Sequence, residues 1–462
     1  MRIADLADRR IAIWGFGREG RAAIAALRQR LPLQPLTLFC GATELESARA
    51  FDAALDIVAG EPDAPTLHGF DVVVKSPGIS AYKPALLTAQ AQGTHFTSGT
   101  ALWFGEHASA KGSDARVIAV TGTKGKSTTS ALIAHLARAL GVRTALAGNI
   151  GLPLLELLDQ HADLWVIELS SFQTGEAGPL ELGVITSLYE EHLDWHGSRE
   201  RYVADKLRLV DASRQLLVNA LQPALLEHTQ AHPQRLLFGQ PKGWHVAEGF
   251  IWRGTHQVFP IAQLAAPGLH NALNACAALA ALEAIGMDAL TAAPALDRFR
   301  PLPHRLQPLG ERDGWHWVND SISTTPLATL AALESLHGRA VTVLVGGHDR
   351  GLDWTPFVEA MRETPPNAIV CMGSNGGRIA EALRSAHVSC PLALVDNLAA
   401  AVAEAKTHTP PAGVILLSPG APSFDQFKDY AERGRQFSAL AAFDPTVIAS
   451  IDGLGIAGSR GG

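Results

Sequence analysis

The 462-residue chain has only four cysteines, Cys40, Cys276, Cys371 and Cys390. They form no C-x-x-C pair and no disulfide framework, which suits a reducing compartment. No uncharged apolar run reaches 18 residues, so no transmembrane helix is predicted. The chain begins Met-Arg-Ile-Ala-Asp-Leu, a charged rather than apolar start, and we expect no signal peptide. These absences predict a cytoplasmic protein without membrane insertion.

An excess of positive charge is also missing. The formal net charge is −7, which leaves no electrostatic footprint for nucleic acid or an anionic membrane. The hydrophobic content of 47% and the charged content of 18% are typical of an ordinary globular protein. Because the chain is too long for one hydrophobic core, we predict about two to four domains.

The most informative stretch is Thr-Gly-Thr-Lys-Gly-Lys-Ser-Thr at residues 121–128. It follows the apolar run Val117–Val120 and leads into a helix-like run from Ser130. Backbone N–H groups in such a turn face an anion, Lys126 adds a point charge, and a hydroxyl can reach Mg²⁺. The generic G-x-x-x-x-G-K-[ST] spacing is not met, because Val120 stands where its first glycine would be. The shorter variant that is present predicts an ATP site, and the alternative is a turn without a ligand. The site residues are Gly122, Thr123, Lys124, Gly125, Lys126, Ser127 and Thr128.

The first segment carries a second glycine-rich turn. Residues 15–20, Gly-Phe-Gly-Arg-Glu-Gly, lie between a predicted strand and an Ala-rich helix, the pattern of a dinucleotide-type fingerprint. The acidic residue expected after the second strand is replaced by Cys40 and Gly41, which argues against NAD. Residues 76–79, Ser-Pro-Gly-Ile, follow the third strand and offer further backbone donors. We predict a phosphorylated nucleotide other than NAD here, and the alternative is a glycine turn without a ligand.

Strand and helix patterns alternate along the rest of the chain and predict an α/β fold with mostly parallel sheets. We expect three domains: a Rossmann-like N-terminal domain over 1–97, a P-loop ATPase-type central domain over 98–301, and a Rossmann-like C-terminal domain over 302–451. Short β segments are predicted within 236–262, and residues 452–462 are predicted to be a flexible tail. The predicted strands of the second and third domains are 164–168, 183–187, 215–219, 315–319, 340–345, 368–372 and 413–417.

Several polar residues follow these strands. Glu168, one strand beyond the P-loop, is placed to hold Mg²⁺, unless it only caps the next helix. His192 follows the next strand in the same way, with a structural histidine as the alternative. Lys206 on spacing alone is a solvated lysine. The other groups after strands or at the domain junction are His270-Asn271, His304-Arg305, Asn319-Asp320-Ser321 and Gly346-Gly347-His348-Asp349-Arg350.

Taken together, these motifs resemble the Mur ligases of peptidoglycan synthesis, most closely the glutamate-adding MurD type. The resemblance is collinear and covers nearly the whole chain. The matching stretches are 76–79, 121–128, 148–153 (Gly-Asn-Ile-Gly-Leu-Pro), 168–173 (Glu-Leu-Ser-Ser-Phe-Gln), 192–194, 206–208, 270–274, 302–305, 319–321, 346–347 and 417–428.

The resemblance implies ATP-dependent amide formation. ATP would phosphorylate the alanine carboxylate of UDP-N-acetylmuramoyl-L-alanine, and the amine of glutamate would attack the acyl phosphate. It implies that Lys126, Ser127 and Glu168 serve the ATP phosphates and a first Mg²⁺. It also implies that His192 and a carbamylated Lys206 serve a second Mg²⁺. Asn271, Arg305 and Asp320 would contact ATP. The residues implied to contact the two other substrates are Gly17, Arg18, Glu19, Ser76, Gly78, Asn149, Ser170, Thr324, Arg350, Ser423, Phe424 and Tyr430.

Departures from the family pattern bear on the amino acid that is added. Enzymes that add D-glutamate carry N-D-S-K-A-T-N and a lysine after the Gly-Gly pair, where this chain has Ile322 and Arg350. Arginine binds carboxylates in a planar fork, so Lys and Arg are not interchangeable there. The family's usual Asn is Lys124 here. The pattern resembles the branch that adds L-glutamate, with a separate epimerase inverting the product, and we expect a monomer.

Four alternatives stay open at this stage. The first is a conventional D-glutamate enzyme that tolerates the Lys-to-Arg change. A folylpolyglutamate synthase-like ligase shares the P-loop type, but the first domain argues against it. A non-catalytic nucleotide-binding scaffold conflicts with the joint presence of Glu168, His192 and Lys206. A dehydrogenase is disfavoured by the residues that follow the second strand.

Overall fold

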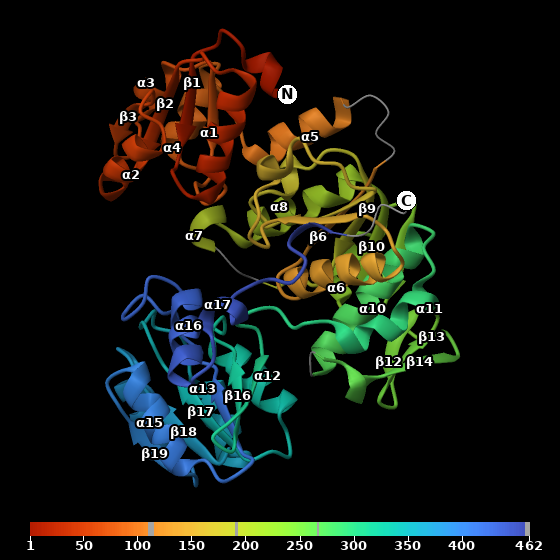
Figure 1. The fold of residues 1–462 in the computed structure, drawn as a ribbon, viewed down its shortest axis with the longest axis vertical. Helices are drawn as coiled ribbons and strands as arrows, with labels where there is room; N and C mark the ends of the chain where they lie inside the picture. Colours follow the sequence, from red (N-terminus) through yellow and green to blue (C-terminus); the bar gives the residue numbers. More distant parts are fainter. Residues whose placement is uncertain (110–114, 190–192, 266–267, 458–462) are drawn as a thin grey trace. The chain divides into compact units, whose positions relative to one another are not determined.

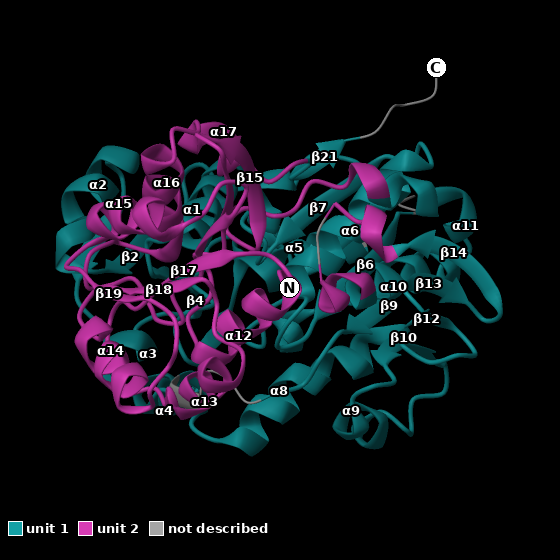
Figure 2. Cartoon of the chain, turned by 90° about the horizontal axis from the view of Figure 1, so that it is seen from below, with its two compact units in different colours: residues 1–260, 273–296, 453–462 teal, residues 261–272, 297–452 magenta. Residues whose placement is uncertain are grey.

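The computed structural model describes residues 1–109, 115–189, 193–265 and 268–457. The chain divides into two compact units (Figure 2). The first comprises residues 1–260, 273–296 and 453–462, and the second comprises 261–272 and 297–452. None of the described helices combines the length and apolar character needed to cross a bilayer.

The first unit opens with a five-stranded parallel sheet in the order β3-β2-β1-β4-β5, of which β1, β2 and β3 are labelled in Figure 1. Strands β1 and β4 are buried at every residue, as expected of continuous apolar runs in a parallel sheet. The strand order reverses at β1, so the turns after β1 and β4 flank a switch point, where α/β sheets bind ligands. The elements are β1 (Ile11–Trp14), α1 (Arg18–Arg30), β2 (Leu36–Cys40), α2 (Leu45–Phe51), β3 (Asp56–Ala59), α3 (Ala64–His68), β4 (Val72–Lys75), α4 (Pro84–Ala91) and β5 (His95–Thr97).

The same unit contains a seven-stranded sheet in the order β11-β10-β9-β6-β8-β7-β21, parallel except for β21. The strands predicted at 164–168 and 215–219 form, the strand predicted at 183–187 begins and ends earlier, and the mixed α/β class with mostly parallel sheets is confirmed. The elements are α5 (Gly99–Ser109), β6 (Arg116–Thr121), α6 (Lys126–Ala139), β7 (Thr144–Gly148), β8 (Leu164–Glu168), β9 (Leu180–Ile185), α7 (Leu193–His196), α8 (Arg199–Ala212), β10 (Ser213–Asn219), α9 (Pro223–His228), β11 (Arg235–Phe238), α10 (Leu269–Ala284), α11 (Ala289–Ala292) and β21 (Gly455–Ala457).

The tail was predicted to be flexible, and this prediction is wrong for residues 455–457. They form β21, which pairs antiparallel with the edge strand β7. Arg138 Nη2 also donates to Gly455 O over 3.0 Å. The short β segments predicted within 236–262 are confirmed as the end of β11 and a three-stranded antiparallel sheet: β12 (Trp244–Ala247), β13 (Phe250–Arg253) and β14 (His256–Pro260).

The second unit is built on a six-stranded sheet in the order β15-β16-β20-β17-β18-β19, in which only β15 is antiparallel. One hydrophobic core covers each face: Val343 and Val345 belong to one core and Leu344 to the other, as alternation along a strand requires. The elements are β15 (Gln307–Arg312), β16 (Trp315–Asn319), α12 (Pro326–Ser335), β17 (Val341–Val345), α13 (Thr355–Glu363), β18 (Ala368–Cys371), α14 (Gly376–Ser385), β19 (Leu392–Leu394), α15 (Leu398–His408), β20 (Val414–Leu417), α16 (Tyr430–Leu440) and α17 (Pro445–Ile448).

Candidate active site

Two glycines shape the turn between β6 and α6. Gly122 and Gly125 have φ values of 146° and 84°, in the region that L side chains rarely adopt. A Cβ on Gly122 would lie 2.1 Å from Thr186 Oγ1, and one on Gly125 would lie 2.5 Å from Asn274 Oδ1. The loop after β9 and helix α10 thus approach the turn so closely that no other residue type fits at these two positions.

The turn leads directly into α6. Lys126 begins that helix, and its Nζ donates to Thr123 O over 3.0 Å. The loop after β9 holds the turn: Thr123 N–H donates to Ser187 O (2.9 Å) and Lys124 N–H to Ser187 Oγ (2.8 Å). The strand, the turn and the helix follow one another as the sequence predicted, an arrangement typical of anion-binding turns, and the binding role of these residues stays a prediction. The residues of the turn and of the helix start are Gly122, Thr123, Lys124, Gly125, Lys126, Ser127 and Thr128.

Glu168 ends β8, directly beside β6. Its register partners are Val120, the residue before the P-loop, and Gly148 on β7. The side chain is buried, with 1% of the residue exposed. Asn149 Nδ2 donates to Glu168 Oε1 over 2.8 Å, whereas Oε2 is buried with no hydrogen-bond partner in the described part of the chain. A lone buried carboxylate oxygen is unfavourable, so this atom is suited to a cation.

Lys206 is not the solvated lysine that its spacing alone suggested. On α8 it is 2% exposed, and its Nζ lies 4.9 Å from the centre of the Tyr202 ring. Tyr202 Oη in turn lies 2.7 Å from Thr123 Oγ1 of the P-loop. The structure therefore brings Lys206 to the nucleotide turn through one tyrosine. His192, the other predicted ligand of the second metal, lies outside the described residues.

Within the described ranges, no three His, Cys, Asp or Glu side chains gather into a group that could hold a metal. Ser170 follows Glu168 by two residues, and its Oγ donates to Gln173 Oε1 over 2.8 Å. Asn149, which follows β7, thus contacts the Glu168 carboxylate, and Ser170 follows the neighbouring strand β8; the contacts of both residues with substrate stay predictions.

The glycine turn after β1 has the expected geometry. Gly15 has a φ of 99°, and a Cβ on Gly20 would lie 1.9 Å from Gly15 O, so α1 packs directly on the turn. Gly17 caps α1, and a Cβ there would meet nothing within 4 Å. Gly78, in the loop after β4, is equally open, while Ser76 Oγ donates to Gly15 O over 3.4 Å. The two predicted substrate turns therefore touch at the switch point.

Arg18 links the first sheet to the central sheet. Its guanidinium pairs with Glu156 (Nε–Oε1, 3.1 Å) and donates to Gly151 O. Gly151 lies two residues after Asn149, so Arg18 reaches the loop that follows β7. This pairing occupies the side chain that was predicted to meet substrate, and the predicted contact of Arg18 stays a prediction.

The Glu19 carboxyl is held in a buried, acidic environment. Burial raises its pKa from 4.5 to about 7, and the neighbouring Glu176 and Glu156 add to this shift while Arg18 opposes it. Burial also raises the pKa of Glu176 and lowers that of Lys75, which is 6% exposed at the end of β4. Sequence patterns gave no signal for this cluster, because its members come from distant segments.

Glu19→Gln (E19Q) should change how stability depends on pH. A carboxyl whose pKa is raised by folding binds its proton more tightly in the folded state, so wild-type stability falls as pH rises from about 4.5 to 7. E19Q does not lose stability in this way. The difference in the free energy of unfolding between E19Q and wild type should therefore grow over that pH range and level off at about 1–3 kcal/mol above pH 7. Thermal unfolding midpoints from pH 4 to 8 would measure it, with exposed Glu46→Gln as the control. Parallel curves for E19Q and wild type would contradict the prediction.

The turn after β2 contains an acid that sequence analysis missed. Glu44 lies four residues beyond Cys40, and its Oε2 accepts from Gly41 N–H over 2.9 Å. Cys40 itself is buried. The dinucleotide-type pattern has its acid directly at the strand end, whereas here a short 3-10 turn after Gly41 brings the Glu44 carboxylate back to Gly41 N–H.

In the second unit, Asp320 lies just after β16 in a closed set of hydrogen bonds. It accepts from Leu306 N–H (3.0 Å), Ser418 Oγ (2.8 Å) and Ser323 Oγ. Burial raises its pKa to about 6. Asn271 on α10 is buried, and Arg305 follows His304, whose φ is 61°. The contacts of Asn271, Arg305 and Asp320 with ATP stay predictions.

Some of the residues that are predicted to bind the added glutamate lie close together in this unit. The Arg350 guanidinium lies 5.6 Å from the centre of the Phe424 ring, a cation–π arrangement. Ser423 is buried beside it, and Phe424 and Tyr430 are exposed. Tyr430 O accepts from Ser321 Oγ over 2.7 Å. The roles of Arg350, Ser423, Phe424 and Tyr430 in binding the added amino acid stay predictions. Thr324 is half-buried in the loop between Ser321 and α12.

Arg433 supports this loop pair and was not predicted. It is 1% exposed and donates to Ser321 O (2.9 Å), Ala421 O (3.0 Å) and Pro422 O (3.2 Å). Burial lowers its pKa to about 10, which still leaves it charged at neutral pH. One buried cation therefore fixes the loops that carry Ser423 and Thr324.

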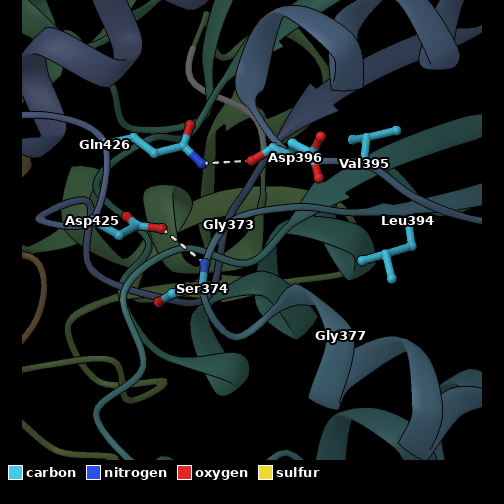
Figure 3. A pocket seen from close by; sticks show the side chains of 8 residues that line it. All are labelled: Gly373, Ser374, Gly377, Leu394, Val395, Asp396, Asp425 and Gln426. Atoms are coloured by element: carbon cyan, nitrogen blue, oxygen red, sulfur yellow. Dashed lines mark hydrogen bonds between the residues drawn. The ribbon is translucent and has the colours of Figure 1, made fainter.

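A cavity of about 450 Å³ lies at the carboxyl ends of β18 and β19 (Figure 3). Its lining residues Asp425 and Gln426 directly follow Ser423 and Phe424 in the sequence. Asp425 Oδ2 accepts from Ser374 N–H over 3.0 Å, and Gln426 Nε2 donates to Asp396 O over 2.8 Å. Both bonds brace the walls of the cavity, which is lined by Gly373, Ser374, Gly377, Leu394, Val395, Asp396, Asp425 and Gln426.

Comparison with known proteins assigns the family. Residues 120–282 match the model of the Mur ligase middle domain, and residues 304–420 match that of the Mur ligase glutamate ligase domain. A protein of Xanthomonas axonopodis pv. citri is 50% identical over 99% of this chain and 100% of its own length. The chain belongs to the Mur ligase family. That relative is named UDP-N-acetylmuramoyl-L-alanine–L-glutamate ligase, as are one from Xylella fastidiosa (50% identical) and one from Micromonospora (39% identical over 95% of this chain and 97% of its own).

Solved Mur ligases share this fold. A UDP-N-acetylmuramate–alanine ligase from Thermotoga maritima superposes with a TM-score of 0.60 at 20% identity, covering 93% of this chain and 98% of that one. A MurF ligase from the same organism, solved with ADP, gives 0.56 at 15% identity, with 95% and 94% covered. At these identities the likeness establishes the Mur ligase fold alone.

Proposed function

We propose that this protein is an ATP-dependent ligase of peptidoglycan precursor synthesis that joins L-glutamate to UDP-N-acetylmuramoyl-L-alanine. The observation that carries the proposal is the pair of adjacent strands β6 and β8. One ends in the nucleotide turn, and the other ends in a buried carboxylate with an unpartnered oxygen. The names of the full-length relatives support the same activity.

The residues fit Mg·ATP. Any Cβ at Gly122 or Gly125 would collide with Thr186 or Asn274, so the two glycines let the turn pack closely at the N-terminus of α6, a place that suits a phosphate group. Lys126 and the α6 N-terminus supply positive charge, and Ser127 with Glu168 Oε2 supplies oxygen ligands. Mg²⁺, when bound, neutralises charge on the phosphate oxygens.

The reaction has two steps, because a carboxylate has no good leaving group and must be activated before an amine can attack it. The alanine carboxylate of the substrate therefore first attacks the γ-phosphorus of ATP, and ADP leaves. The product is an acyl phosphate. The amine of glutamate attacks the carbonyl carbon of the acyl phosphate and forms a tetrahedral intermediate. This intermediate loses the proton of the amine and releases inorganic phosphate, which leaves the amide. Lys126 holds charge on the transferred phosphoryl group, and Asn149 and Ser170 orient the substrate beside Glu168.

A second Mg²⁺ is proposed at Lys206. A neutral lysine amine that adds CO₂ becomes a carbamate, releases one proton, and then carries the oxygen ligands that a hard cation prefers. The position of Lys206 supports the proposal, because its buried side chain lies against the Tyr202 ring, and Tyr202 contacts the P-loop residue Thr123. His192 would complete this site.

The L-enantiomer is proposed from the second unit. The guanidinium of Arg350 lies over the Phe424 ring, and the side chain at position 322 is the apolar Ile322. A carboxylate of glutamate can therefore pair with the fork of Arg350, while position 322 offers no cation for the other carboxylate. Because the positive side chains stand at other positions than in the enzymes that add D-glutamate, they favour the enantiomer whose carboxylates lie opposite them. A separate epimerase would then invert the product, and the ligase would act as a monomer.

Phosphate release with UDP-N-acetylmuramoyl-L-alanine and Mg·ATP tests this proposal, with L-glutamate compared with D-glutamate. We expect kcat/KM to be about 100-fold higher or more with L-glutamate, since one well-placed charged pair separates the enantiomers. Preference for D-glutamate would make the protein a conventional MurD enzyme. Release with neither acceptor would contradict the proposed substrate pair, and ATP hydrolysis without the UDP-substrate would favour a nucleotide-binding scaffold.

A further inference from the structure

We propose that Tyr82 is a positioning residue that couples binding of the UDP-substrate to the helix that carries Lys206. Tyr82 ends the loop after β4, which begins with the predicted substrate residues Ser76 and Gly78. The inference rests on the proposed function, because that function makes residues 76–82 a substrate loop and Lys206 a metal ligand.

The Tyr82 phenol reaches Asp205, the residue before Lys206. Tyr82 Oη lies 2.8 Å from both Asp205 Oδ1 and Asp205 Oδ2, so its one O–H group is shared between the two carboxylate oxygens. Asp205 is 7% exposed. The guanidinium carbon of Arg201 lies 4.9 Å from the centre of the Tyr82 ring, a cation–π contact that adds to the packing of the ring. A hydrogen bond to a buried carboxylate is stronger than one between neutral groups.

Asp205 is connected, through His196, to the loop that follows Glu168. His196 is fully buried; its Nδ1 lies 2.7 Å from Asp205 Oδ2, and its Nε2 lies 3.0 Å from Ser171 Oγ. Thr174 Oγ1 also donates to Asp205 O over 2.6 Å. Ser171 adjoins Ser170, three residues after Glu168. The chain Tyr82–Asp205–His196–Ser171 therefore ties the substrate loop to both proposed metal ligands.

Trp195 makes a second connection between the same parts. Its Nε1 donates to Pro77 O over 3.1 Å, and its carbonyl accepts from Ser80 Oγ over 2.6 Å. Its ring stacks on Phe172, with ring centres 4.5 Å apart and 24° between the planes, and meets the Tyr82 ring edge-on at 5.8 Å. Trp195 thus contacts the loop 76–82 directly, and its neighbour His196 contacts Asp205, the hydrogen-bond partner of Tyr82.

The network reaches the nucleotide turn at its other end. Lys206 lies against Tyr202, whose Oη is 2.7 Å from Thr123 Oγ1. Any shift of α8 that follows the substrate loop therefore moves the wall of the ATP site. Coupling between two ligands is reciprocal, so the UDP-substrate should tighten the binding of nucleotide by the same factor as nucleotide tightens the binding of the UDP-substrate.

Tyr82→Phe (Y82F) removes only the hydroxyl and tests the coupling. The dissociation constant of a non-hydrolysable ATP analogue with Mg²⁺ would be measured by calorimetry, with and without saturating UDP-N-acetylmuramoyl-L-alanine. In wild type we expect the UDP-substrate to tighten the analogue at least about 5-fold, the lower end of typical couplings. In Y82F the ratio should fall to near 1, the affinity for the analogue alone should be unchanged, and kcat should fall about 10-fold.

Two further variants sharpen the test. Lys83→Ala changes the next residue along the chain, whose Nζ pairs with Glu61 (2.7 Å), and it should keep the wild-type ratio. Asp205→Asn should also lose the coupling, and adding Y82F to it should change nothing more, because both act on one bond.

A wild-type ratio in Y82F, or lower thermal stability with the ratio kept, would overturn the inference in favour of a merely structural tyrosine. Failure of the proposed function looks different: wild type would then neither bind UDP-N-acetylmuramoyl-L-alanine nor release phosphate with it.

Discussion

Lys206→Ala (K206A) should lower kcat about 100- to 1,000-fold while the protein stays folded. The loss corresponds to about 3–4 kcal/mol, the scale on which one metal ion stabilises charge in a transition state. Removing the side chain leaves a space next to the Tyr202 ring, since Lys206 is only 2% exposed. A short soluble carboxylate such as acetate fits the chemistry of the lost carbamate, and it should restore activity about 10-fold at high concentration.

The measurement is initial-rate phosphate release with and without acetate, beside wild type and exposed Lys242→Ala as the control. Wild type incubated with ¹³C-bicarbonate should in addition show a carbamate carbon signal by NMR that K206A lacks. Full activity in K206A would remove Lys206 from the site. A low rate without acetate rescue and without the carbamate signal would leave Lys206 as a plain cation.

The strands and the nucleotide turn could be predicted because their signals are local. An apolar β-branched run such as Val117–Val120 specifies a buried parallel strand by itself. Glycines around a lysine at the start of a helix specify an anion cradle, whatever lies around them. Glu168 was found by the same route, since its place at a strand end follows from the run Leu164–Ile167. The family resemblance added roles, but the geometry of these residues follows from short-range rules.

The rest of the site depends on partners that are distant in sequence. Helix α8, Arg199–Ala212, has charged residues on all sides, so its pattern gives no buried face. Asp205 and Lys206 are buried because other segments cover them, among them the loop of Tyr82, which is 123 residues away. Strand β21 has three residues and forms only because β7 leaves an edge free. Periodicity along the sequence carries no information about either arrangement, because both depend on segments that are far apart in the chain.

Glu168→Gln (E168Q) should separate metal binding from folding, because the structure gives the two carboxylate oxygens different surroundings. Oε1 keeps its bond from Asn149 Nδ2 in the variant, while the unpartnered Oε2 is replaced by an uncharged NH₂ group.

Burying an unpaired charged oxygen costs about 1–3 kcal/mol, so without ligand E168Q should unfold at a temperature equal to or above that of wild type. With Mg·ATP the order should reverse: wild type gains stability from binding, and the variant gains less because its affinity for the metal is lower. Its kcat should fall about 100-fold or more, with partial recovery at high Mg²⁺. Thermal scans over a Mg²⁺ titration measure both effects. Glu181→Gln is the matched control, since Glu181 lies on the same sheet but pairs with Arg214 at the surface, where an ion pair contributes little. An E168Q enzyme with the Mg²⁺ dependence of wild type would show that Oε2 faces no metal, and the unpaired oxygen would then be a destabilising feature without a catalytic role.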